Sequence, residues 1–221
     1  MKRLDYLHIT SDIYEHPRNL TTPTVLPMLR EFKFDGSALN WVTSLLSFIH
    51  SCRLETVHLV NLLCPLVSSW TGLLIALGCC DSHTLTNVNI TDIHCYGRHS
   101  ENIHLNQDAI APLFSLSNLI RLELQPYQGF DIGDETLRQL SLVRSLVLGS
   151  LTSTWTIPSP ITLVGLIPLI ANCPQLHHLG IVIDTTIIPD ACISTPTSNT
   201  NIKTLQVGCS ASPIQSALLP S

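Results

Sequence analysis

The chain has 221 residues and a formal net charge of −5; 45% of its residues are hydrophobic and 12% are charged. This content of apolar residues in a chain this long predicts a folded protein with a large buried core and argues against disorder. Only three lysines are present. The chain therefore lacks the clustered cations that bind phosphate backbones, and we expect no nucleic-acid partner.

The uncharged segment 60–80 is the stretch most similar to a membrane span. Asn61, Pro65 and Ser68 interrupt its apolar residues, and no basic flank would set an orientation. We therefore predict a buried loop followed by a helix, and no membrane partner. Asp5 and His8 break the apolar core that a signal peptide needs. The eight cysteines favour reduced, mostly buried thiols and a cytoplasmic or nuclear location.

A seven-residue pattern occurs eight times along the chain. It consists of an apolar residue, two variable residues, an apolar residue, a variable residue, an apolar residue and a final variable residue. From one first residue to the next, the spacings are 25, 25, 31, 34, 24, 33 and 26 residues. Such self-similarity is typical of repeat proteins. The copies span residues 4–10, 29–35, 54–60, 85–91, 119–125, 143–149, 176–182 and 202–208.

The pattern predicts a short strand in each repeat. Side chains alternate along a strand, so the fourth and sixth residues share one buried face, while the third, fifth and seventh residues point the other way. The first residue anchors the chain as it enters the strand. No hairpin turns separate the copies, so the strands are expected to run parallel, side by side.

Helices are expected between the strands. Residues 37–52 have apolar side chains at three- and four-residue steps, with Gly36 and Ser37 as turn and candidate N-cap. Further helices are predicted over 107–116, 134–140 and 162–171, with Pro112 and Pro168 in a first turn or at a kink. We thus predict an α/β leucine-rich-repeat solenoid, a horseshoe with strands on the concave face and helices on the convex face. Residues 1–221 form a single domain of about eight irregular repeats.

The variable strand residues are the candidate binding site. In the first five repeats they include charged, amide and aromatic side chains and would form two rows across the concave face. Such a mixed wall suits a protein partner, although simple solvation is the alternative. The candidates are Tyr6, Glu31, Thr56, Asn87 and Arg121 in the row of third residues, and His8, Lys33, His58, Asn89 and Glu123 in the row of fifth residues.

Metal and catalytic sites are not predicted. His177 and His178 occupy variable positions of the seventh repeat, so the stretch NCPQLHHLG needs no metal. Another group has no clean zinc-finger spacing and is interpreted as buried thiols and loop histidines: Cys79, Cys80, His83, His94, Cys95, His99 and His104. The motifs of common hydrolases, phosphate loops and calcium loops are absent. We expect a protein that is not an enzyme, with no catalytic residues, no metal and no cofactor.

The stretches HSCRLETVHL, NCPQLHHLGI and SNTNIKTLQVG, with irregular spacings and short helices, resemble the C-terminal region of fungal F-box/leucine-rich-repeat proteins. The resemblance implies a substrate receptor of a cullin ubiquitin ligase, whose repeats hold a protein while an N-terminal F-box binds a Skp-type adaptor. The first repeat begins at Leu4, so an adaptor is expected only if an F-box lies upstream of Met1. The alternative is a free-standing scaffold or inhibitor. We also expect the repeats to be truncated at both ends, since IQSALLPS (214–221) resembles the start of another helix.

Overall fold

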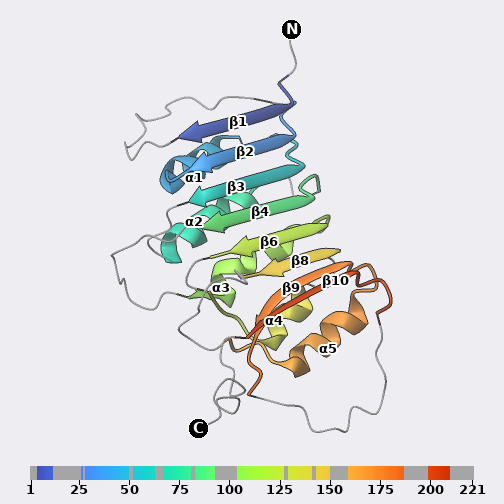
Figure 1. Ribbon diagram of the computed structural model, residues 1–221. Coiled ribbons are helices and arrows are strands. Elements are labelled where there is room, and N and C mark those ends of the chain that lie inside the picture. Colours follow the sequence, from blue (N-terminus) through green and yellow to red (C-terminus); the bar gives the residue numbers. More distant parts are fainter. Residues whose placement is uncertain are drawn as a thin grey trace.

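Eight parallel strands form the main sheet of the computed structural model, and they are stacked in sequence order (Figure 1). The order is β1-β2-β3-β4-β6-β8-β9-β10, so among the described strands β1 and β10 lie at opposite ends and the sheet does not close into a barrel. The structure describes residues 4–11, 26, 28–49, 52–62, 67–80, 83–92, 104–126, 129–140, 143–149, 159–186 and 199–209. The strands are β1 Tyr6–Ser11, β2 Glu31–Gly36, β3 Thr56–Leu62, β4 Asn87–Asp92, β6 Arg121–Gln125, β8 Ser145–Leu148, β9 His178–Ile183 and β10 Thr204–Cys209.

The pairing register confirms the alignment of the eight heptapeptides. The third residue of each copy pairs with the third residue of the next, as in Tyr6 with Glu31 and Glu31 with Thr56. The same holds at every later junction, to His178 with Thr204. The fourth and sixth residues point into the core and are buried from β2 to β9.

A repeated set of backbone hydrogen bonds joins each heptapeptide to the next. The carbonyl of the second residue accepts bonds from two consecutive amides, those of the second and third residues of the following copy, at 2.7–3.4 Å. All seven junctions have this arrangement, so the repeats are equivalent in backbone structure as well as in sequence. The accepting carbonyls belong to Asp5, Arg30, Glu55, Thr86, Ile120, Arg144 and His177.

Helices form a second layer against the apolar face of the sheet, and strands and helices share one core. The described helices are α1 Leu39–Phe48, α2 Val67–Gly78, α3 Gln107–Ile110, the 3₁₀ helix η1 Ala111–Ser115, α4 Asp134–Gln139 and α5 Leu163–Asn172. Neighbouring helices also pack on one another, α1 on α2, α2 on α3 and η1, and α4 on α5. The predicted α/β organisation is therefore confirmed.

Two helix predictions need correction. The N-cap of α1 is Ala38, because Ser37 lies in a tight turn in which its carbonyl accepts the amide of Leu39 at 3.0 Å. The helix expected over 107–116 divides into α3 and η1, since Pro112 lies in the first turn of the 3₁₀ segment. Pro168 lies inside α5, where it has no N–H to donate.

A second, two-stranded sheet was not predicted. β5 (Leu105–Asn106) pairs in parallel with β7 (Phe130–Asp131). Asn106 then caps α3, with its side-chain oxygen accepting the amide of Ala109 at 3.0 Å. Strands of two residues are too short to show an alternating pattern.

The helix predicted in the uncharged segment 60–80 is confirmed as α2, and the segment begins with the end of β3 rather than with a loop. Within the described residues no helix is long and apolar enough to cross a membrane. The predicted terminal helix at 214–221 lies outside the described residues, as does the sequence 93–103.

Candidate functional site

All ten predicted binding residues lie on one face of five neighbouring strands. The register places Tyr6, Glu31, Thr56, Asn87 and Arg121 in one row across β1, β2, β3, β4 and β6. The fifth residues of the same strands form the parallel row His8, Lys33, His58, Asn89 and Glu123. We call this surface the polar strand face. Its side chains are exposed or half-buried, in contrast to the buried residues between them.

Glu123 is the most connected residue of the polar strand face. It accepts bonds from Asn89 at 2.9 Å, from Arg121 at 3.0 Å and from Gln125 at 2.7 Å. Its side chain is only 14% exposed, so these donors replace much of its hydration. The carboxylate is thereby fixed in place and holds the side chains of three neighbours on β4 and β6.

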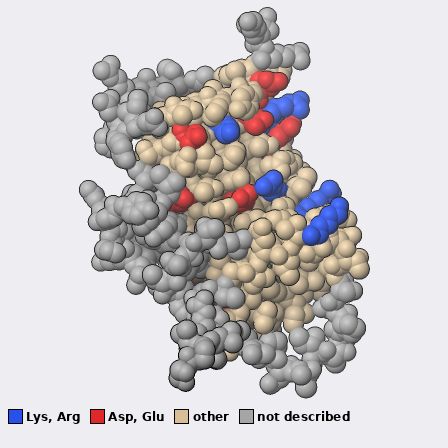
Figure 2. Space-filling view, viewed as in Figure 1, with Lys and Arg blue, Asp and Glu red and all other residues tan. Residues whose placement is uncertain are grey.

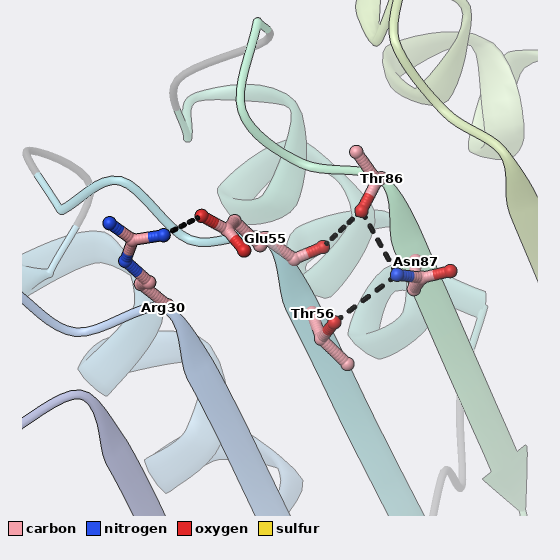
Figure 3. A network of polar contacts seen from close by, with 5 residues as sticks. All are labelled: Arg30, Glu55, Thr56, Thr86 and Asn87. Atoms are coloured by element: carbon pink, nitrogen blue, oxygen red, sulfur yellow. Dashed lines mark hydrogen bonds and ion pairs between the residues drawn. The ribbon is translucent and has the colours of Figure 1, made fainter.

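A second network joins β2, β3 and β4 where the chain enters the sheet (Figure 3). Arg30 pairs with Glu55 at 2.8 Å, and the Thr86 hydroxyl donates to the Glu55 carbonyl at 3.0 Å. The Asn87 amide donates to the hydroxyls of Thr86 at 2.9 Å and Thr56 at 3.3 Å. These bonds run from one repeat to the next, so they position side chains across strands.

His58 lies at the centre of the face among charged side chains. Burial is the main cause that lowers its pKa, and the positive charge of Lys33 acts in the same direction. Glu123 raises the pKa of this imidazole, and the effect is smaller than that of Lys33. The neutral form of His58, which both donates and accepts hydrogen bonds, is therefore favoured.

Two residues that sequence reasoning did not select form a further bond between β2 and β3. Asn61 donates to Asp35 at 2.7 Å from a left-handed backbone conformation (φ 57°), which asparagine tolerates better than most residues. The β3–β4 register shifts at this point, between Leu59 and Leu62. An asparagine directly after a predicted strand is the signal that could have indicated this turn.

On β8 and β9 the side of the sheet that carries the polar rows has buried apolar side chains. Val147 and Val182 point to the same side as the polar rows but are buried. Gly180 pairs with Val147 across the two strands. A Cβ on Gly180 would lie 3.2 Å from a Val147 methyl group, so glycine leaves room for the valine side chain. The fifth residue of the β8 heptapeptide and the seventh residue of the β9 heptapeptide therefore do not extend the solvent-facing rows of the first five repeats.

Charges are mixed along the strand face. Figure 2 shows Lys and Arg side chains interleaved with Asp and Glu over the upper strands. The right edge in the same view carries, at about mid-height, blue side chains without red ones beside them. The face thus offers charged groups of both signs over its upper strands and cations at its right edge.

Three of the four cysteines with described side chains are buried. Cys52, Cys80 and Cys173 are free and buried, and burial raises the pKa of the Cys80 thiol to about 12 and that of Cys173 to about 11. Cys79 is exposed, which corrects the expectation for this residue. Among the described residues no three His, Cys, Asp or Glu side chains are arranged to hold a metal ion. His94, Cys95 and His99 lie outside that part of the chain.

Comparisons with protein-family models, with curated proteins and with solved structures found no match for this chain. The functional argument therefore depends on the geometry of the molecule.

Proposed function

We propose that the chain is a non-catalytic protein-binding module, a leucine-rich-repeat solenoid that binds its partner on the polar strand face. The observation that carries this proposal is the junction repeated seven times, in which one carbonyl accepts two amides of the next repeat. Repeats that are equivalent in this way produce an extended surface built from side chains at identical positions.

The size and chemistry of the face support a protein as partner. The five strands of the polar strand face, separated by roughly 4.8 Å, give a surface about 19 Å wide on a sheet about 34 Å wide. Exposed Tyr6, Glu31 and Arg121 supply an aromatic ring and both charges. Tyrosine and arginine are enriched where protein interfaces concentrate binding energy.

The sequence resemblance gives this module a place in ubiquitin ligation. In the favoured form of the proposal the bound protein is the substrate of a cullin ligase, and an F-box encoded upstream binds a Skp-type adaptor. The second form is a scaffold or inhibitor that binds a protein without an adaptor. Purification of the full-length gene product separates them, because adaptor and cullin copurify only in the first case.

Photo-crosslinking tests the binding face directly. Benzoylphenylalanine is placed at Glu31 on the strand face and, as matched control, at Ile75, which is 50% exposed on α2. We expect a discrete crosslinked protein from Glu31 and none from Ile75. The captured protein, once identified and purified, should crosslink to the Glu31 variant again.

Crosslinking of the same protein from both positions, or from Ile75 alone, would contradict the proposed face. The Arg121→Glu variant adds a quantitative test, since it reverses the charge of an exposed side chain on this face. It should weaken binding of the purified partner by at least about tenfold, which corresponds to roughly 1.4 kcal/mol. Unchanged affinity would contradict the assignment.

A further inference from the structure

The residues at which the strands begin form one edge of the sheet. Along this edge the charge changes from mainly negative in the first three repeats to positive in the last three. In the first three heptapeptides the second and third residues include Asp5, Glu31 and Glu55, with Arg30 as the only cation. In the last three repeats the same positions carry four basic side chains and no carboxylate. We call these four the basic edge: Arg144, His177, His178 and Lys203.

The register brings the basic edge together in space. Arg144, His177 and Lys203 are the second residues of successive repeats, joined by the repeated backbone bonds. His178 pairs with Ser145 on one side and with Thr204 on the other. Arg144 and Lys203 are exposed and the two histidines are half-buried, and all four lie where three neighbouring strands begin.

Among the described residues, Arg30 and Arg121 are held in ion pairs, whereas Arg144 and Lys203 of the basic edge are not. Arg30 binds Glu55 and Arg121 binds Glu123, each within 3.0 Å. No carboxylate among the described residues forms an ion pair with Arg144 or Lys203. In Figure 2 a group of blue atoms at the right edge, at about mid-height, has no red neighbours. The charges of this strip are therefore available to an external anion.

We propose that the basic edge binds an acidic segment of the protein partner, a run of Asp and Glu residues that crosses the starts of β8, β9 and β10. The inference depends on the proposed function, because the segment belongs to the protein held on the polar strand face. Arg144 and Lys203 lie two strand spacings apart, about 10 Å, and an extended peptide covers that distance with about three residues. A short acidic run is therefore sufficient.

A nucleic acid fits this strip less well than an acidic peptide. The strip is only three strands wide, and the chain as a whole has a net charge of −5. A longer polyanion would extend toward Glu31, Glu55 and Asp5, which repel it. A short carboxylate segment ends before it meets these acids.

The test uses a fluorescein-labelled hexaglutamate peptide, the full chain and fluorescence anisotropy. We expect saturable binding that weakens when salt is raised from 50 to 200 mM, and no binding of a hexaglutamine peptide. R144Q/K203Q should weaken hexaglutamate binding about five- to tenfold. The matched control R30Q/R53Q removes two exposed arginines from the other end of the same sheet and should change affinity less than about twofold.

Three results would overturn the inference: no saturable hexaglutamate binding, equal weakening in both double variants, or tighter binding of a single-stranded DNA with six phosphates. These outcomes are distinguishable from failure of the proposed function. If the partner crosslinks at Glu31 but hexaglutamate does not bind, only the acidic segment is rejected. If hexaglutamate binds and crosslinking at Glu31 fails, the strand face is rejected as the main binding surface.

Discussion

Asp134, at the first residue of α4, shows how one side chain joins two repeats. Its carboxylate accepts the backbone amide of Thr162 at 2.9 Å and the Thr162 hydroxyl at 2.8 Å. That hydroxyl in turn accepts the amide of Gly165 at 3.3 Å, which caps α5. A Cβ on Gly165 would lie 1.9 Å from Asp134, so this glycine is required by the close approach of the carboxylate.

We predict that Gly165→Ala lowers the free energy of unfolding by about 2 kcal/mol or more, because the methyl group displaces Asp134 from Thr162. The control is Gly72→Ala in α2, where the nearest atom to the new Cβ lies 3.9 Å away. That change should stabilise the protein by about 0.5–1 kcal/mol, as alanine does in helices. Urea unfolding of both variants provides the measurement, and stabilisation by both would contradict the model of the α4–α5 contact.

Burial and Lys33 lower the pKa of His58 from its ordinary value of 6.5, so the unfolded chain takes up the proton first as the pH falls. The wild-type protein should therefore lose stability relative to His58→Asn when the pH falls below 6.5, and the difference should be constant above that value. Urea unfolding across this pH range measures both proteins. Parallel curves, or a steeper loss in His58→Asn, would contradict the environment described for His58.

At the scale of the elements, the heptapeptides predicted the strands because side chains alternate between the two faces of a strand, so apolar residues at alternate positions share one buried face. Residues 54–60 illustrate this, since Leu54, Val57 and Leu59 are buried while His58 between them is half-exposed. Repetition also supplied the register, because equivalent residues of stacked repeats must pair. The three- and four-residue steps of apolar side chains likewise placed α1, α4 and α5 to within a few residues.

What the sequence did not reveal depends on contacts between distant residues. The two-residue strands β5 and β7 exist because Leu105 and Phe130 meet in space. The bonds of Glu123 come from β4 and β6, and nothing local to Glu123 specifies Asn89 as its partner. The burial of Val147 depends likewise on tertiary packing.

Asparagines at two repeat junctions also form contacts with residues that are distant in the sequence. Asn118 donates to the carbonyl of His83, and Asn201 donates to the carbonyl of Pro174, each at 2.7 Å. Both asparagines directly precede the first residue of a heptapeptide, and both acceptors lie two residues before the first residue of the preceding copy. Sequence and geometry together therefore define a second inter-repeat bond, which is present at two of the junctions.

The register predicts opposite effects of one substitution at adjacent residues of β3. Leu59→Asp places an unpaired charge in the core between stacked repeats, and we expect a loss of about 4 kcal/mol or more in the free energy of unfolding. His58→Asp places the same charge on the polar strand face, near Lys33 and Arg121. It should change stability by less than about 1 kcal/mol. Equal losses of thermal stability would contradict the register.

At the scale of the whole molecule, each repeat depends on its neighbours for burial. Leu179 on β9 is fully buried, whereas Leu205, the equivalent residue on the end strand β10, is 56% exposed. Leu7, the equivalent residue on the other end strand β1, is only half-buried. The same linear order separates the acidic and basic ends of the sheet edge. The polar strand face and the basic edge are thus both consequences of strands added one after another in a single direction.

The measurement that tests this arrangement most directly is a pair of distances by pulsed electron spin resonance. Nitroxides are attached to ketone-bearing unnatural amino acids, first at Tyr6 and Arg121, then at Tyr6 and Thr204. The strand order places these pairs four and seven strand spacings apart, so we predict distances of about 19 Å and about 34 Å. A Tyr6–Thr204 distance no longer than the Tyr6–Arg121 distance would show a closed or rearranged sheet and would contradict the sequential stack.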